Sequence, residues 1–510
     1  MTKKTFTLSK SRYIRGLQCH KSLWLFTHDR DLREVSKSAA ASFQQGNEVG
    51  ECAHKIFPGG TFIPFEGISF EEQISQTQKA LKTAKVIYEA TFSYGGVLVK
   101  ADIMRKVGRS WELYEVKATN EVKDVHRDDA AVQYYVISGS GVKISKTFVS
   151  HLNKEYVRKG ELDVQALFVS EDVTADIKAK QAGIQAKIER QQKMLAGKKA
   201  PKIDIGPHCA KPYPCDFEKH CWQHIPENSI FDLAGNGVKK WPLYKDGIVK
   251  MKDIPLDKLK GQQFQQVQAY LDKKPVVDRA GLKTFLKDIW YPLYYLDFET
   301  FLAAVPPYDG LKPYQQIPFQ YSLHIQNGKG GKLYHKEFLA KPNCDPRKEL
   351  LDSLLAEIPD GACVLVYYQA FEKGRLKELA AQFPRKAKRI NAIISNVRDL
   401  LVPFKKRVLY SCEQQGSHSI KKVLPAFVKD MSYEGLEVGD GGEAIEAYQK
   451  MCTVADDPQE LAKIRKALLE YCCQDTLAMV RLLEVIGKNA VRPGPTYPLY
   501  RSFNWCYFVG

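Results

Sequence analysis

The sequence predicts an α/β multidomain protein, and three observations carry this prediction. Its 510 residues exceed what one ordinary hydrophobic core supports, and 44% hydrophobic residues are enough to build more than one core. From residue 291 onward, short apolar strands alternate with helical patterns, which is typical of an α/β sheet. Nearer the start, strand patterns at 86–105 and 111–118 and an apolar stretch at 146–152 predict a second, mixed α and β domain.

Helical and connecting segments lie between these two parts. Residues 171–196 carry apolar side chains at helical spacing and are followed by Gly197, which predicts one long amphipathic helix. Residues 228–290 read as a connecting subdomain of short, polar, helical pieces. After it we expect strands and helices in the order "YYLDFET" (294–300), "FQYSLHIQ" (319–326), "RKELLDSLLAEI" (347–358), "ACVLVYY" (362–368) and "FEKGRLKELAAQF" (371–383). The predicted domains are therefore 1–227, 228–290 and 291–510.

Charge and composition narrow the class of protein. Lys and Arg number 76 against 59 Asp and Glu, a formal charge of +17 that favours a polyanionic partner, with nucleic acid the leading candidate. A solvated lysine-rich surface gives the same sum. The start of the chain lacks the apolar segment of a signal peptide and no apolar run spans a bilayer, so a cytoplasmic protein is expected. In that compartment the 12 cysteines favour metal or cluster ligation over disulfides.

A first group of chemical residues lies on a predicted hairpin, "GGVLVKADIMRKVGRSWELYEVKAT". Asp102 lies on its first strand, and Glu115 and Lys117 share one face of its second strand because they are two residues apart. Phosphodiester hydrolysis needs a divalent metal held by carboxylates and a cation near the phosphate. The alternative is a cross-strand salt bridge.

Motifs on either side of this hairpin resemble the RecB-like branch of the PD-(D/E)xK nucleases. They are "ECAHKIF" with His54, the entry strand "YEATFSYGG" with Glu89, and "RDDAAVQYYVI" with Gln133, and the resemblance covers about residues 5–225. It implies a restriction-endonuclease-like core in which Lys117 is catalytic and Gln133 lies beside it. The metal ligands that it implies are His54, Asp102, Glu115 and the main-chain carbonyl of Val116. One departure is Ile137, where the branch often has a tyrosine; Tyr134 and Tyr135 lie nearby.

Four cysteines form a second group. Cys209, Cys215 and Cys221 are separated by five residues each, and Cys19 lies far upstream. Thiolates suit zinc or an iron–sulfur cluster, but the tight pairs usual in zinc sites are missing. The arrangement resembles the [4Fe-4S] staple of CRISPR-associated and AddB-type RecB-like nucleases, which implies that a cluster ties the beginning of the domain to its end. Zinc, or cysteines without any ligand, are the alternatives.

A third group begins in "YYLDFET", where Asp297 and Glu299 share one face of a strand. Glu372 follows a buried strand at the beginning of a helix, and Tyr471 and Asp475 lie four apart on a late helix. Alone, the strand acids would suit a solvated edge, and the helix pair would suit a half-exposed surface.

The order of these residues resembles the DEDD exonucleases of the RNase H-like fold, of the type that carries a tyrosine. The resemblance implies that Asp297, Glu299, Glu372 and Asp475 bind two Mg²⁺ or Mn²⁺ ions and that Tyr471 orients the attacking water. The family usually has aspartate at the position of Glu372, and Asp399 is a further candidate acid.

Three nearby features are given simpler interpretations. His418 is expected to lie at a helix cap formed by Ser417 or Ser419. Lys421 and Lys422 suit either phosphate contact or a solvated surface. Cys472 and Cys473 are expected to be helix packing residues.

The expected function is therefore that of a metal-dependent nuclease with two sites, acting on DNA or RNA. The resemblance implies 3′-to-5′ exonuclease activity for the C-terminal site. A nucleic-acid-binding scaffold with one or both sites inactive is the alternative, and uncompensated carboxylates facing phosphates argue against it. A small-molecule phosphoesterase fits the metals but not the charge of +17.

Overall fold

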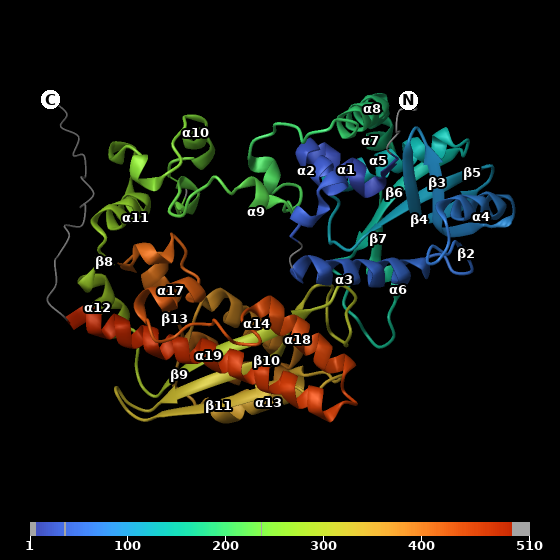
Figure 1. Ribbon diagram of the computed structural model, residues 1–510. Coiled ribbons are helices and arrows are strands. Elements are labelled where there is room, and N and C mark those ends of the chain that lie inside the picture. The colour runs from blue at the N-terminus through green and yellow to red at the C-terminus, as the bar shows by residue number, and fades with distance from the viewer. Residues whose placement is uncertain (1–6, 35–36, 236, 492–510) are drawn as a thin grey trace, which may run out of the picture. The chain divides into compact units, whose positions relative to one another are not determined.

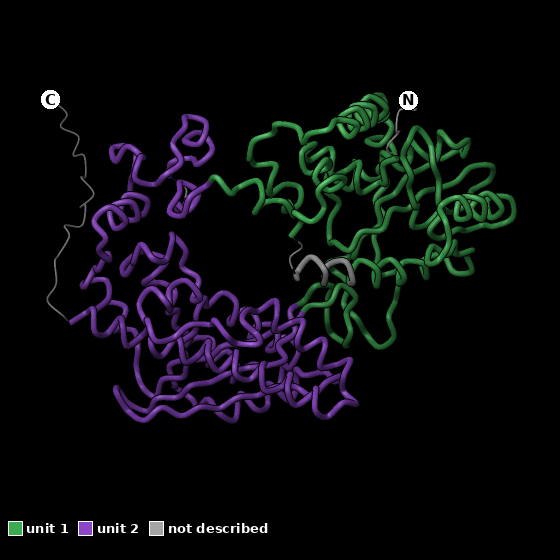
Figure 2. The backbone as a smooth tube through the Cα atoms, in the orientation of Figure 1, with its two compact units in different colours: residues 1–224, 302–315 green, residues 225–301, 316–510 purple. Residues whose placement is uncertain are grey.

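The computed structural model describes residues 7–34, 37–235 and 237–491 (Figure 1). The chain divides into two compact units: unit 1 comprises residues 1–224 and 302–315, and unit 2 comprises residues 225–301 and 316–510 (Figure 2). Both units combine helices with mixed sheets, so the predicted α/β multidomain class is confirmed. Across the described ranges, no helix is long and apolar enough to cross a membrane.

Unit 1 is built on a mixed sheet with the strand order β2-β3-β4-β5-β6-β7, and β1 pairs with β4. β3, β4 and β5 are antiparallel neighbours, whereas β5 and β6 run parallel. The predicted hairpin is therefore β4 and β5. The strands are β1 (Leu8–Ser9), β2 (Thr61–Phe62), β3 (Val86–Tyr94), β4 (Val97–Val107), β5 (Ser110–Lys117), β6 (Ile144–Leu152) and β7 (Phe168–Asp172).

Helices cover both faces of this sheet because its strand side chains alternate between two cores. On β5, Leu113 packs into a core with α5, and Tyr114 packs into a second core with α3. Glu115 is two residues beyond Leu113 and therefore faces α5. The helices of unit 1 are α1 (Lys10–Gln18), α2 (His20–His28), α3 (Lys37–His54), α4 (Phe70–Thr83), α5 (Asp124–Gly139), α6 (Val164–Leu167), α7 (Thr174–Lys180), α8 (Ile184–Leu195) and α9 (Glu218–Cys221).

The single long helix expected over 171–196 is wrong. Residues 171 and 172 end strand β7, and a 3-10 turn at Gln181–Gly183 separates α7 from α8. The Asp172 carboxylate accepts hydrogen bonds from the amide and hydroxyl of Thr174, which ends the strand in a turn. Gly183, a poor helix former, lies at the second break. The apolar side chains of both helices still face the same core.

Unit 2 contains a mixed sheet with the order β11-β10-β9-β12-β13. β12 runs parallel to β9 and β13, and β10 is antiparallel to β11. These strands, with the small pair β8 and β14, are β8 (Val276–Val277), β9 (Leu293–Leu302), β10 (Gln316–Gln326), β11 (Leu333–Leu339), β12 (Cys363–Val366), β13 (Val397–Asp399) and β14 (Leu409–Tyr410). All five predicted elements are present, and β11 and β13 were not predicted.

Two cores sandwich this sheet. α13, α14 and α15 pack against Leu296 and Phe298, whereas α12 and the long helix α19 pack on the face that carries Tyr295. The expected alternation along β9 is thus confirmed, and Asp297 and Glu299 face α19. The helices of unit 2 are α10 (Lys240–Lys245), α11 (Gly261–Asp272), α12 (Arg279–Lys287), α13 (Arg347–Glu357), α14 (Gln369–Gln382), α15 (Ala387–Asn396), α16 (Leu401–Lys405), α17 (Ile420–Phe427), α18 (Gly441–Thr453) and α19 (Pro458–Val491).

The segment expected to connect the domains consists of short helical pieces, as predicted. It includes the 3-10 turns Ile230–Asp232, Met251–Asp253 and Leu256–Lys258 together with α10 and α11. These pieces share a small core of their own, centred on Ile230, Leu243 and Met251. α12, at the end of the segment, packs into the core beneath α19 instead.

Candidate active sites

Four acidic side chains meet in unit 2. Asp297 and Glu299 project from β9, Glu372 from the first turn of α14, and Asp475 from α19. Glu299, Glu372 and Asp475 are 8%, 2% and 6% exposed, so three of the four carboxylates are almost withdrawn from water. The ligand atoms of Asp297, Glu299 and Cys472 lie within 4.8 Å of one another. The sequence prediction that these acids form one group is consistent with this geometry.

The electrostatics of the group show that the carboxylates repel one another. Burial, followed by the charge of Asp475, holds the pKa of both Asp297 and Glu299 well above the ordinary value. Burial also raises the pKa of Glu372 to about 8, and its Oε2 atom is buried without a hydrogen bond. A bound divalent cation is the usual way to keep such carboxylates ionised.

Aromatic side chains and a lysine surround Asp475. The Tyr433 hydroxyl donates a hydrogen bond to Asp475, and the ring of Tyr471, 4% exposed, has its centroid 6.3 Å from that of Tyr433. Lys421 Nζ lies 5.1 Å from the ring centroid of Tyr471 and 5.4 Å from that of Tyr433. Burial raises the pKa of Asp475 to about 6, while the two tyrosines and the charge of Lys421 oppose the rise. Sequence reasoning missed Tyr433.

Lys421 differs from its neighbour Lys422. Lys421 is half-buried, donates to the carbonyl of Gly439 at 2.7 Å, and lowers the pKa of Glu299 through its charge. Lys422 is exposed and bonds to Gln415 at 3.0 Å. Of the two lysines, Lys421 is therefore the one available to the acidic group.

The expected helix cap next to His418 is only partly correct. Ser419 is the N-cap residue of α17, but its side chain makes no capping hydrogen bond. The Ser417 hydroxyl instead accepts from the amide of Ser419 at 3.1 Å. His418 accepts a bond from Tyr367 through its main-chain carbonyl, at 2.6 Å.

Asp399 has a supporting position. Its Oδ1 atom accepts hydrogen bonds at 3.0 Å from the amides of Tyr368 and Leu401. Tyr368 is the N-cap residue of α14 and has a φ of 87°, a strained value for a tyrosine. Asp399 therefore fixes the turn from which Glu372 projects.

Replacing Glu372 by glutamine is expected to stabilise the metal-free protein above neutral pH. A carboxyl group whose pKa is raised from 4.5 to about 8 binds its proton more tightly in the folded state, so stability falls as pH rises between those values. A tenfold difference in proton affinity corresponds to about 1.4 kcal/mol, and we expect Glu372→Gln to gain on the order of 2–4 kcal/mol at pH 8 and almost nothing at pH 4.5. Chemical denaturation in EDTA at the two pH values measures this difference. An equal gain in the free energy of unfolding at pH 4.5 and at pH 8 would contradict the raised pKa of Glu372.

A second group of charged residues lies in unit 1. Lys117 Nζ donates to Glu115 Oε1 at 2.6 Å and also bonds to Asp129 of α5. Gln133, from the same helix, donates to the other oxygen of Glu115. Asp102 accepts from the amide of Val116 at 2.7 Å. The structure thus brings Asp102, Glu115, Lys117 and Gln133 together beside the main chain of Val116.

Lys10, which the sequence analysis missed, joins this group. It is the first residue of α1, and its Nζ donates to Glu115 Oε1 at 2.7 Å and lies 3.7 Å from Asp129 Oδ1. Burial alone would raise the pKa of Glu115. The charges of Lys10 and Lys117 outweigh burial and hold this pKa well below its ordinary value. Burial alone would lower the pKa of Lys117. The negative charges of Asp129 and Glu115 outweigh burial and hold this pKa well above its ordinary value. Lys117 is therefore a fixed cation in these contacts.

His54 and Glu89 stand at the margin of the same group. His54 stacks on Tyr88 with ring centroids 4.3 Å apart, and its Nε2 atom lies 3.9 Å from Glu89 Oε1. That nitrogen is buried without a hydrogen bond, as a free metal ligand would be. Glu89 has a φ of 57°, and the ladder between β3 and β4 omits it and Asp102. The strands are therefore irregular where these acids lie.

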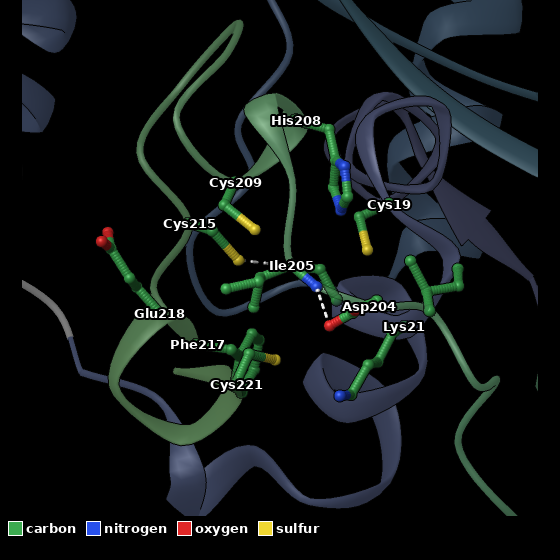
Figure 3. A pocket seen from close by; sticks show the side chains of 12 residues that line it. Cys19, Lys21, Asp204, Ile205, His208, Cys209, Cys215, Phe217, Glu218 and Cys221 are labelled. Carbon is green, nitrogen blue, oxygen red and sulfur yellow. Dashed lines mark hydrogen bonds between the residues drawn. The ribbon is translucent and has the colours of Figure 1, made fainter. Parts of the chain in front are cut away.

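The four cysteines line one pocket in unit 1 (Figure 3). Cys19 is the N-cap residue of α2, and its side chain makes no capping hydrogen bond. The loop that carries the other three cysteines is tied to α1 by Arg15, whose guanidinium bonds to Asp216 at 2.6 and 3.0 Å. Gln18 donates to the carbonyls of His208 and Tyr213 at 2.8 and 2.7 Å. Segments about 190 residues apart are thereby held together without any metal.

The spacing of the four sulfurs bears on what they hold. Among the described residues, groups of three ligand atoms within 4.8 Å occur at two places, and neither includes these cysteines. Thiolates around a tetrahedral zinc ion are about 3.8 Å apart. A pocket whose sulfurs are more widely spaced suits a cluster, which has an iron–sulfur core between the thiolates. His208 lines the same pocket.

Comparisons with known proteins find a match to one family model and to uncharacterized mycoplasma proteins. A family model described as a domain of unknown function, DUF2779, matches residues 294–419, which include Asp297, Glu299 and Glu372 but not Tyr471 or Asp475. The uncharacterized protein MG366 homolog of Mycoplasma pneumoniae is 29% identical over 50% of this chain and 44% of its own length. The uncharacterized protein MG366 of Mycoplasma genitalium is 26% identical over 51% of this chain and 45% of its own length. The chain thus spans less than half of these relatives, and its DUF2779 match lies in unit 2 except for residues 302–315, which belong to unit 1.

Proposed function

We propose that this chain is a divalent-metal-dependent nuclease with two active sites. The C-terminal site would be a 3′-to-5′ exonuclease of the DEDD type on an RNase H-like fold, and the N-terminal site a RecB-like nuclease on a restriction-endonuclease-like fold. The observation that carries the proposal is the meeting of Asp297, Glu299, Glu372 and Asp475, which come from three separate elements of unit 2. Four neighbouring carboxylates, three of them buried, are stabilised as anions when they bind divalent cations.

In the C-terminal site, each residue would have a distinct role. Mg²⁺ or Mn²⁺ held by the four acids would activate water and stabilise the leaving oxygen. Tyr471, four residues before Asp475 on α19, would orient the attacking water. Lys421, above the rings of Tyr433 and Tyr471, would attract the phosphate through its charge.

In the N-terminal site, His54, Asp102, Glu115 and the carbonyl of Val116 would hold a divalent cation. Lys117, kept protonated by Asp129 and Glu115, would stabilise charge that develops on the scissile phosphate. Gln133 holds the Glu115 carboxylate in place through its hydrogen bond. The formal charge of +17 supports a nucleic acid as the common substrate.

The four cysteines would hold a [4Fe-4S] cluster that ties α2 to the loop at 209–221. Their common pocket, in which no three of the sulfurs lie within 4.8 Å of one another, supports this assignment over zinc. A cluster would add to the bonds that Arg15 and Gln18 already make across the same segments. Iron and acid-labile sulfide in anaerobically purified protein, at about four of each per chain, are the expected result.

The proposal is tested with anaerobically purified protein and Mn²⁺ on linear and circular, single- and double-stranded DNA and RNA. We compare the wild type with Asp297→Ala, Lys117→Ala and the double variant, and we expect each single substitution to remove activity on a different substrate class. Release of mononucleotides from 3′-labelled strands should depend on Asp297. If the wild type binds these polymers but degrades none, the nuclease proposal fails and a binding scaffold is favoured.

A further inference from the structure

We propose a zinc site in unit 2, formed by His324, His335 and Cys473. His324 lies on β10, His335 on β11 and Cys473 on α19. One ligand atom from each residue lies within 4.8 Å of the others. Imidazole nitrogens and a thiolate are preferred ligands of zinc. The two nuclease sites proposed above use none of these side chains.

The register of the hairpin brings the two histidines together. His324 and His335 are directly opposite in the antiparallel ladder of β10 and β11, and their ring centroids are 4.5 Å apart. Burial lowers the pKa of His324 to about 4 and also lowers the pKa of His335, so both rings are neutral near pH 7. A neutral imidazole carries one nitrogen with a free lone pair.

A chain of hydrogen bonds determines which nitrogen of each ring is free. The Thr476 hydroxyl donates to the carbonyl of Cys473 at 3.1 Å, so it must accept from its other two neighbours. These are His324 Nδ1 at 2.8 Å and the Ser322 hydroxyl at 2.6 Å. Since Ser322 donates to Thr476, it accepts from His335 Nε2 at 2.9 Å. The protons therefore lie on His324 Nδ1 and His335 Nε2.

This assignment leaves His324 Nε2 and His335 Nδ1 unprotonated, as metal ligands require. The partners on the opposite nitrogens are hydroxyl groups of Ser322 and Thr476, which are 1% and 0% exposed. Metal-binding histidines usually carry such a second hydrogen bond, which fixes the tautomer and the ring orientation. The two residues form a rigid support for the imidazoles.

Glu337 is the fourth ligand in this proposal. It is directly opposite Ser322 in the ladder, and its Oε2 atom lies 3.9 Å from His335 Nδ1, the nitrogen that the hydrogen bonds leave free. Its charge also reaches the thiol of Cys473. Two imidazoles, one thiolate and one carboxylate would make a four-coordinate set once the Glu337 side chain turns toward the three residues that already lie close together.

Binding requires only a small contraction of the group. At Zn–S and Zn–N distances of about 2.3 and 2.0–2.1 Å, neighbouring ligand atoms in a tetrahedral site lie about 3.3–3.6 Å apart. One ligand atom each of His324, His335 and Cys473 lies within 4.8 Å of the other two, so these separations need to shorten by at most about 1.5 Å. The side chains of His335 and Glu337 are 26% and 37% exposed, which gives the ion a route from solvent.

The position of the site gives it a structural role. Zinc would tie the β10–β11 hairpin to α19 at Cys473, two residues from both Tyr471 and Asp475. A helix fixed at that point presents Tyr471 and Asp475 toward β9 in one orientation. Gln320 supports the same packing through its bond to the carbonyl of Leu468 at 2.7 Å.

The test uses the full chain, purified anaerobically, supplied with Zn²⁺ and then freed of loosely bound metal. We expect about one zinc per chain, with an X-ray absorption spectrum that shows imidazoles and a single sulfur at about 2.3 Å. Cys473→Ser and, if that variant does not fold, His335→Gln should lose this zinc. Cys452→Ser, a half-buried cysteine of α18, is the matched control and should keep it.

Asp297→Asn separates this site from the acidic group, which also contains a cysteine. Under the proposal this variant keeps its zinc, because Asp297 belongs to the other group. Zinc that is lost with Asp297→Asn but retained by Cys473→Ser would overturn the proposal. So would a shell of four sulfurs, or a wild type that takes up no zinc. Since no turnover is measured, failure of the nuclease proposal does not alter these outcomes.

Discussion

Asp297→Asn is expected to lower the rate of the C-terminal site by on the order of 10³-fold, because it removes an anionic ligand from a cation that contributes several kcal/mol to catalysis. Asparagine keeps the size of the side chain. Burial and the neighbouring acids hold the pKa of Asp297 well above its ordinary value, so the metal-free protein already tolerates a neutral group there. Folding should therefore be preserved. Single-turnover rates on 3′-labelled strands with saturating Mn²⁺ measure the loss.

A thermal shift with Mn²⁺ gives a second readout that does not depend on activity. The cation should raise the melting temperature of the wild type by binding the folded state and should raise that of Asp297→Asn much less. Asp430→Asn is the matched control, since Asp430 is exposed in the same unit and pairs with Arg481 at the surface. Undiminished exonuclease activity in Asp297→Asn would exclude Asp297 as a ligand.

Local periodicity was sufficient to predict where the strand acids point. Side chains alternate along β9, so once Leu296 and Phe298 belong to one core, Asp297 and Glu299 must face the other side. The same rule predicts that Glu115 and Lys117 share a face of β5. These predictions succeeded because side chains alternate strictly along a strand, so a one-residue slip would move these charged groups away from α19 and α5 and into the opposite apolar cores.

Residues that join a site through packing alone could not be predicted. Tyr433 reaches Asp475 from a segment between α17 and α18 that has no regular periodicity. Lys10 reaches Glu115 across 105 positions of sequence, and only the docking of α1 on the sheet brings them together. Each of these side chains is an ordinary surface type when read alone.

The two histidines of the β10–β11 hairpin also could not be predicted to lie together from the sequence. His324 and His335 carry no spacing motif, and their proximity depends on the register of β10 and β11, of which β11 was not predicted. Helix interruptions are also hard to predict, because the apolar positions of α7 and α8 keep helical spacing across the break before Ile184. Asp172, which ends β7 by bonding to Thr174, is the local signal for the first interruption.

Lys117→Met is expected to lower the rate of the N-terminal site by about 10²–10³-fold, the effect of removing one group that stabilises developing charge. Its Nζ bonds to Glu115 and Asp129, and the substitution leaves Lys10 as a cation on Glu115. Glu115 therefore stays ionised, and metal binding should persist while turnover falls. Rates on the substrate class that survives in Asp297→Ala, together with Mn²⁺ affinity, measure both effects. Lys123→Met, at an exposed lysine of the same unit, is the control. A lysine needed only for turnover leaves the metal bound when it is replaced. If Lys117→Met loses Mn²⁺ affinity as much as rate, Lys117 instead serves to position the carboxylates of Glu115 and Asp129.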